Sequence, residues 1–99
     1  MIQIMIVDDH ALVREGYIRL INSDRRFKVI GSAKSGEDAV SQLNKISPDV
    51  LITDMSMPGM SGLSVIVNAL ALHPNLNIIL CSDVPPFSVA LGFGVRGLI

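Results

Sequence analysis

The sequence predicts an α/β fold built on one parallel β-sheet. Short apolar runs alternate along the chain with segments of helical periodicity, and the connections between them are short. The apolar runs contain few polar residues, which is typical of strands that are covered on both faces. Such strands are joined by right-handed helical crossovers. With 99 residues, the chain is expected to form a single domain.

Capping residues and prolines mark where the expected elements begin and end. Asp9 could cap the first helix, and Ser35 stands three residues before Asp38, a spacing typical of a helix start. Pro48 ends the second helix and Pro74 the third. The expected strands are residues 2–7, 27–33, 49–54 and 78–81, and the expected helices are residues 11–22, 35–47 and 61–72.

Each expected helix carries a stripe of apolar residues that should face the sheet. In chain order the three stripes are Leu12, Val13, Gly16, Tyr17, Leu20 and Ile21; Ala39, Val40, Leu43 and Ile46; and Leu63, Ile66, Val67 and Leu70.

The last part of the chain carries weaker signals. Pro85 and Pro86 open a stretch with a poor helical pattern, and Gly92 and Gly94 each lower its helix propensity by about 1 kcal/mol. Residues 98–99 are expected to begin a fifth strand.

Composition and charge exclude several classes of protein. The formal net charge of -1 gives no long-range attraction to nucleic acid or to an anionic membrane. No apolar run approaches the length of about 20 residues that spans a bilayer, and the N-terminus lacks the basic start of a secretory signal. The single cysteine, Cys81, cannot form an intrachain disulfide, which fits a reducing, cytoplasmic setting.

Carboxylates follow two of the expected strands. Asp8 and Asp9 come directly after the first strand, and Asp54 ends the third, before a turn at Pro58 and Gly59. Ligands bind at the carboxyl ends of strands in open α/β sheets. Three carboxylates that meet there need a cation, and Mg²⁺ prefers oxygen ligands.

With a metal present, one carboxylate could attack a phosphoryl group and form an aspartyl phosphate. Ser82, at the end of the fourth strand, is the candidate hydroxyl beside the transferred oxygens. Taken alone, Asp8 or Asp9 serves equally well as a cap or turn residue. His10 is expected to be a solvated residue of the first helical turn.

The runs Ile-Val-Asp8-Asp9-His10 and Asp54-Met-Ser-Met-Pro-Gly-Met-Ser-Gly62 resemble the receiver domain of two-component response regulators. The run Leu-Val-Arg-Glu-Gly16 is similar to the NarL/FixJ (LuxR-type) subfamily, in which a helix-turn-helix DNA-binding domain follows the receiver. The resemblance covers essentially residues 1–99. It implies a flavodoxin-like fold, a doubly wound five-stranded parallel sheet with strand order 2-1-3-4-5.

The resemblance also implies a role for each site residue. Asp54 matches the aspartate that accepts a phosphoryl group from a sensor histidine kinase. Asp8 and Asp9 match the acidic pair that holds Mg²⁺ together with Asp54, and the backbone carbonyl of Ser56 matches a further ligand. Ser82 matches the hydroxyl that moves toward the phosphoryl group. Such a domain is not an enzyme in the usual sense, because it takes part only in its own phosphorylation and dephosphorylation.

Two departures from the family pattern concern the end of the chain. No residue matches the lysine that follows the family's fifth strand, and the segment 83–93 is shorter and richer in proline and glycine than the family's helix. We therefore expect a C-terminally truncated receiver that lacks its last helix and any DNA-binding output domain. A sheet face left bare in this way would favour a homodimer or another partner chain.

Other functions were weighed against the phosphorylated receiver. A phosphorylation-independent interaction or dimerisation module with a degenerate receiver fold stays open, because the lysine is missing. A Mg²⁺-dependent phosphohydrolase is disfavoured, since Met55 and Ser56 follow Asp54 where such enzymes have a second acid. A dinucleotide-binding domain is disfavoured because no glycine-rich turn follows the first strand.

Overall fold

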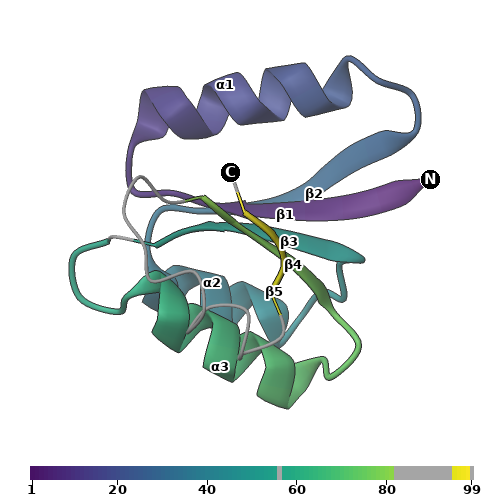
Figure 1. Ribbon diagram of the computed structural model, residues 1–99. Helices are drawn as coiled ribbons and strands as arrows, with labels where there is room; N and C mark the ends of the chain where they lie inside the picture. The colour runs from purple at the N-terminus through teal and green to yellow at the C-terminus, as the bar shows by residue number, and fades with distance from the viewer. Residues whose placement is uncertain (56, 82–94, 99) are drawn as a thin grey trace.

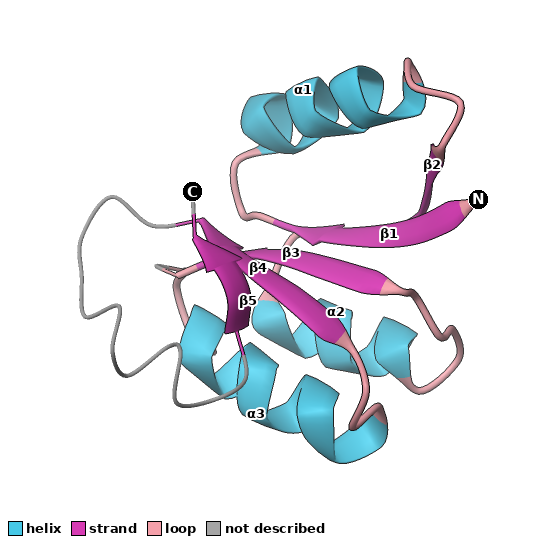
Figure 2. Ribbon diagram, turned by 45° about the vertical axis from the view of Figure 1, so that its right-hand side comes forward, coloured by secondary structure: helices cyan, strands magenta, loops and turns pink. Residues whose placement is uncertain are grey.

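A five-stranded parallel β-sheet forms the middle layer of the molecule, with helices on both of its faces (Figures 1 and 2). The computed structural model describes residues 1–55, 57–81 and 95–98. Its elements are β1 (Ile2–Val7), α1 (Ala11–Asn22), β2 (Phe27–Ala33), α2 (Gly36–Leu43), β3 (Val50–Asp54), α3 (Gly62–Leu72), β4 (Asn77–Cys81) and β5 (Val95–Leu98). Helix α1 lies on one face of the sheet, and α2 and α3 lie on the other.

The strand order is β2-β1-β3-β4-β5, and every neighbouring pair is parallel. This confirms the predicted α/β class and the order 2-1-3-4-5. From β1 the chain first adds β2 on one side and then crosses over to add β3 on the other side of β1, so the winding direction reverses there. A ligand site is expected outside the carboxyl ends of β1 and β3, where this reversal occurs.

The last strand begins earlier than predicted, at Val95 rather than at Leu98. Parallel pairing with β4 places Val95 opposite Ile78 and Leu98 opposite Leu80. A glycine inside a strand lowers its intrinsic preference, but ladder pairing at the edge of the sheet outweighs that local signal. The helical stretch predicted after Pro85 lies outside the described residues.

The larger core lies between the sheet and the pair α2 and α3. Its most deeply buried large side chains are Met5, Leu43, Leu51, Ile66, Ile78 and Leu80. The predicted inward positions of α2 and α3 are largely confirmed, since Ala39, Leu43 and Ile66 are fully buried. Val67 is an exception, because it is exposed on the outer side of α3.

No helix among residues 1–55, 57–81 and 95–98 is long and apolar enough to cross a membrane.

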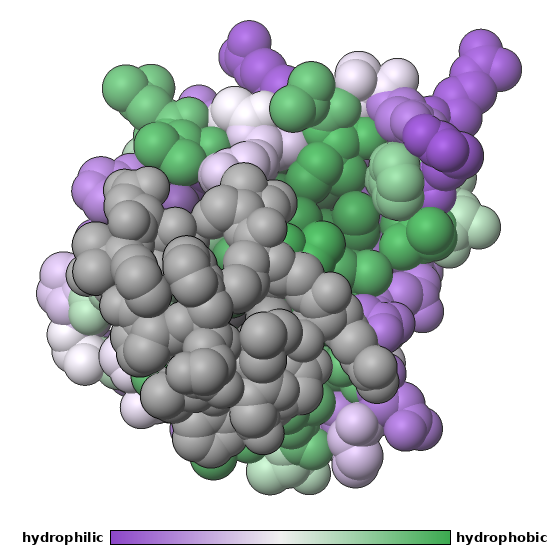
Figure 3. All heavy atoms as spheres, viewed as in Figure 1, coloured by the Kyte–Doolittle hydropathy of each residue, from purple (hydrophilic) through white to green (hydrophobic). Residues whose placement is uncertain are grey.

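The apolar stripe predicted for α1 is confirmed at Tyr17 and Ile21 and wrong at its other positions. Leu12 and Leu20 are 85% and 72% exposed, whereas Tyr17, Ile18 and Ile21 pack against a second core cluster on the sheet. Apolar residues surround much of this helix, so periodicity alone could not select the buried side. At 3.6 residues per turn, the observed contact face is rotated by about a quarter turn from the predicted stripe. Figure 3 shows apolar atoms exposed on the side of the molecule where α1 lies above the sheet.

A close contact between α3 and the end of β3 positions the functional edge of the sheet. The backbone N–H of Gly62 donates to the carbonyl of Met55 at 2.9 Å, and the Ser61 side chain caps α3 by accepting from the N–H of Ser64. A Cβ at residue 62 would overlap the Asp54 carbonyl oxygen and lie 2.7 Å from Met55 Cα. Only glycine therefore lets α3 begin directly against Asp54.

We predict that Gly62→Ala destabilises the protein, because the added methyl group meets backbone atoms that no side-chain rotation can move away. The expected loss in the free energy of unfolding is about 1–3 kcal/mol. The matched control is Gly16→Ala in α1, where an added Cβ meets nothing within 4 Å. This control should gain about 0.5–1 kcal/mol, as alanine does over glycine inside a helix. Urea denaturation of the two variants checks both signs, and equal stability of the variants would contradict the prediction.

Candidate functional site

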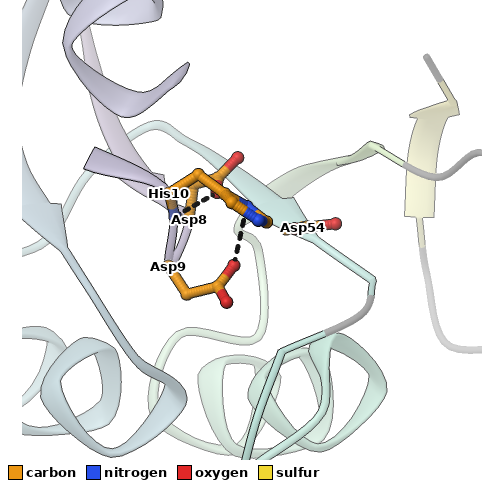
Figure 4. A group of neighbouring side chains, drawn as sticks. All are labelled: Asp8, Asp9, His10 and Asp54. Atoms are coloured by element: carbon orange, nitrogen blue, oxygen red, sulfur yellow. Dashed lines mark hydrogen bonds and ion pairs between the residues drawn. The ribbon is translucent and has the colours of Figure 1, made fainter. Parts of the chain in front are cut away.

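Three carboxylates meet at the carboxyl edge of the sheet. Strands β1 and β3 are neighbours, and their register places Val7 opposite Thr53. The residues that follow, Asp8 and Asp54, therefore lie level with each other, with Asp9 beside them. One potential ligand atom from each of Asp8, Asp9, His10 and Asp54 lies within 4.8 Å of every other. Figure 4 shows these four side chains gathered between the two strands.

Asp8 is held by the backbone around it and by α1. Only 6% of this residue is exposed. Its Oδ1 accepts a hydrogen bond from the backbone N–H of His10 at 2.8 Å, and its carbonyl oxygen accepts one from Arg14 Nη1 at 2.7 Å. Its own N–H donates to the carbonyl of Ala33 in β2. Two of these hydrogen bonds fix the backbone of Asp8, and the one from the His10 N–H orients its carboxylate.

His10 lies over the acidic pair. It is the N-cap residue of α1, and 66% of its side chain is exposed, as expected for a solvated residue. Its Nδ1 nevertheless lies 3.1 Å from Asp8 Oδ1 and 3.0 Å from Asp9 Oδ1 (Figure 4). The hydrogen bond with Asp8 and the negative charge of Asp9 raise the pKa of this imidazole above its usual value. Sequence analysis did not place His10 in the cluster; its position next to the Asp8-Asp9 pair was the available signal.

The donor set fits Mg²⁺. Asp9 Oδ1 is buried and has no hydrogen-bond partner among the described residues. Its 3.0 Å approach to His10 Nδ1 is close enough for an ion pair, but the geometric hydrogen bond of that nitrogen goes to Asp8. The contact between His10 Nδ1 and Asp9 Oδ1 is therefore electrostatic rather than a hydrogen bond. A buried carboxylate oxygen without a hydrogen bond, beside two further carboxylates, is the environment that a hard divalent cation stabilises.

The loop after β3 is fixed by two features. Gly59 has a φ of 79°, which few other residues adopt, so the turn predicted at Pro58 and Gly59 is present. Glu37, at the start of α2, accepts a hydrogen bond from the backbone N–H of Met60 at 3.0 Å. These contacts hold the loop near Asp54. The predicted site residues Ser56 and Ser82 lie outside the described part of the chain.

Cys81 and Tyr17 lie on the α1 side of Asp54. Cys81 pairs with Asp54 across β3 and β4, and Tyr17 Oη donates a hydrogen bond to Cys81 Sγ at 3.8 Å. Burial raises the pKa of the Cys81 thiol, and the hydrogen bond to Cys81 raises the pKa of Tyr17. Burial therefore disfavours the thiolate form that makes a cysteine reactive.

Comparison with known proteins agrees with the arrangement of the site. The sequence model of the response regulator receiver domain family matches residues 4–99. The chain is 35% identical over 100 residues to the response regulator GacA of Pseudomonas viridiflava, covering 98% of this chain and 47% of that protein. It is 48% identical over 63 residues to the response regulator UvrY of Escherichia coli K12, covering 64% of this chain and 29% of that protein. The chain thus spans at most about half the length of these relatives.

Solved structures show the same fold. The response regulator domain of Thermotoga maritima CheB superposes with a TM-score of 0.91 at 28% identity, over 100% of this chain and 77% of that one. The isolated REC domain of RcsB from Salmonella enterica serovar Typhimurium, solved with the phosphomimetic BeF3-, gives a TM-score of 0.88 at 27% identity. That match covers 99% of this chain and 75% of the RcsB chain.

We predict that Asp9→Asn raises the stability of the chain in the absence of metal and lowers the further stabilisation that Mg²⁺ provides. Without metal, the variant should be more stable than the native chain by up to about 1 kcal/mol, because one like charge is removed. Mg²⁺ at about ten times its native dissociation constant should add about 1.4 kcal/mol to the native chain. In the variant that gain should fall below about 0.5 kcal/mol if affinity drops about tenfold.

Urea denaturation in EDTA and in Mg²⁺ measures both effects. The matched control is Asp24→Asn, in the loop between α1 and β2, where Asp24 pairs with Arg26 rather than with the cluster. This control should keep the full response to Mg²⁺. An equal response to Mg²⁺ in Asp9→Asn and the native chain would contradict the prediction.

Proposed function

Because the chain belongs to the response regulator receiver domain family, whose role is phosphorylation-dependent signalling in two-component systems, we propose that it accepts a phosphoryl group on Asp54. The observation that carries this proposal is the convergence of Asp8, Asp9 and Asp54 within 4.8 Å at the carboxyl edge of the sheet. Asp54 ends β3, and Gly62 lets α3 start directly beside it.

The chemistry proposed for Asp54 is a single phosphoryl transfer. One Asp54 oxygen forms a bond to phosphorus while the bond between phosphorus and the donor breaks, and the donor leaves with that electron pair. The product is an acyl phosphate on Asp54. The donor in the cell is a phosphorylated histidine of a sensor kinase, and acetyl phosphate, which would release acetate, can replace it in a test.

Asp8, Asp9 and Asp54 would hold Mg²⁺, together with the backbone carbonyl of Ser56. The bound ion supplies positive charge that offsets the carboxylates and the incoming phosphoryl oxygens. The buried Asp9 Oδ1 that lacks a hydrogen bond supports this assignment. Ser82 is proposed to donate its hydroxyl to a phosphoryl oxygen, as the resemblance to the family implies.

The regulated output is proposed to be transcription. GacA and UvrY are response regulators, and RcsB from Salmonella enterica serovar Typhimurium has been solved bound to the promoter rprA, at 27% identity to this chain. We infer a cytoplasmic receiver that controls a DNA-binding output domain in a longer protein. Phosphorylation adds charge and acceptor oxygens at Asp54, which would bias the conformation of the neighbouring strand ends. A homodimer is the candidate active form.

The second candidate is an interaction module that works without phosphorylation. The observation in its favour is that the sequence has no lysine after Lys45, so the lysine that would pair with the phosphoryl group is not among these 99 residues. In this case the acidic cluster would serve the fold alone. Self-association measured by sedimentation would then be the same with and without a phosphodonor.

We predict that the native chain gains the mass of one phosphoryl group when it is incubated with Mg²⁺ and acetyl phosphate. Asp54→Asn should gain none, because an amide is not a nucleophile for this reaction. Asp24→Asn, which removes an aspartate at the opposite edge of the sheet, should be labelled like the native chain. Intact-mass spectrometry reports the result directly. Labelling of Asp54→Asn would refute the assignment, and a native chain that stays unlabelled would favour the interaction module.

A further inference from the structure

His10 places a nitrogen donor among the carboxylates of the proposed metal site. We propose that His10 Nδ1 is a metal ligand here, and that it raises the affinity of the cluster for a divalent first-row transition ion, such as Ni²⁺ or Zn²⁺, relative to its affinity for Mg²⁺. This inference rests on the proposed metal site and adds a ligand to it. None of the roles implied by the family resemblance involves this histidine.

The spacing of the donor atoms supports the proposal. With metal–ligand bonds of about 2.1 Å, two neighbouring ligand atoms at right angles lie about 3.0 Å apart. His10 Nδ1 lies 3.0 Å from Asp9 Oδ1 and 3.1 Å from Asp8 Oδ1. One potential ligand atom from each of the four residues lies within 4.8 Å of the others. Opposite ligands of one ion are about 4.2 Å apart, so the set would need to contract by only about half an ångström.

The buried Asp9 Oδ1 is a second reason to assign His10 Nδ1 as a metal ligand. Asp9 Oδ1 faces His10 Nδ1 but has no hydrogen bond among the described residues, because the Nδ1 hydrogen bond goes to Asp8. In the neutral imidazole with its hydrogen on Nε2, Nδ1 presents a lone pair toward both carboxylates. One divalent ion bound by this nitrogen and by both carboxylates would satisfy all three groups at once.

Donor chemistry determines which ion gains from this ligand. Carboxylate, carbonyl and water ligands suit Mg²⁺, whereas imidazole suits Zn²⁺, Ni²⁺ and Cu²⁺. Every site of this kind binds Ni²⁺ more tightly than Mn²⁺, so tight binding of Ni²⁺ alone does not identify the nitrogen. The decisive quantity is the change in the ratio of Ni²⁺ affinity to Mg²⁺ affinity when the imidazole is removed.

The test is calorimetric titration of Ni²⁺ and of Mg²⁺ into the tag-free 99-residue chain, its His10→Asn variant and its His73→Asn variant. Asparagine is a preferred N-cap residue, so His10→Asn should keep α1 folded, which circular dichroism checks. His73 is the other of the two histidines, and its Nε2 contacts the carbonyl of Leu43 between α2 and α3. It therefore controls for the loss of one imidazole elsewhere.

We expect His10→Asn to lower Ni²⁺ affinity about tenfold or more, the scale on which changes to a metal's ligand environment act. Mg²⁺ affinity should stay the same or rise, because the imidazole that contacts the same carboxylate oxygens is lost. His73→Asn should change neither affinity. In nitrogen-15 spectra, Zn²⁺ should shift the imidazole resonances of His10 and leave those of His73 in place.

The outcomes separate this inference from the proposed function. If Ni²⁺ and Mg²⁺ affinities fall together in His10→Asn, or if neither changes, His10 is not a ligand and the inference is overturned, while Mg²⁺ binding by the carboxylates still stands. If the native chain binds Ni²⁺ through His10 but does not bind Mg²⁺, the inference holds and the Mg²⁺ part of the proposed function fails. Absence of binding for both ions overturns both.

Discussion

Negative charge gathered at one edge of a parallel sheet is the constraint on which the rest of this structure depends. The pairing of β1 with β3 brings Asp8 and Asp54 level, and chain connectivity adds Asp9. Like charges at this spacing raise one another's energy unless a cation or hydrogen-bond donors offset them. The backbone N–H of His10 and its imidazole supply such donors to Asp8. The site is therefore held in place by the fold but is electrostatically incomplete without positive charge.

The fold holds this edge through contacts that do not involve the carboxylates. The larger core lies between the sheet and α2 and α3, on the face where Gly62 brings α3 against the end of β3. Glu37 ties the start of α2 to the loop after β3. Helix α1 has no buried residue and meets the sheet along a narrow face. Strand β3 is thus supported mainly from one side, where substitutions should affect the position of Asp54 most.

Structure could be predicted where a sequence pattern is compatible with one arrangement only, and could not where several arrangements fit the same pattern. Apolar strands that alternate with helices leave only a parallel sheet, and an aspartate after a buried strand must lie at its carboxyl edge. The sequence did not determine which side of α1 faces the sheet, because apolar residues such as Leu12 and Ile18 surround the helix. The start of β5 depends on pairing with β4, which no local pattern encodes. The position of His10 depends on a cap geometry that forms only when α1 begins at Ala11.

The orientation of His10 has a consequence for how any cation reaches the site. The imidazole occupies the space that faces both Asp8 and Asp9, so it meets the same negative charge that a metal would meet. A cation that takes only oxygen ligands must compete with this group for the same carboxylate oxygens. A cation that accepts nitrogen converts the same group into a ligand. One side chain can therefore weaken the binding of one class of ion and strengthen that of another, and the identity of the ion decides which effect prevails.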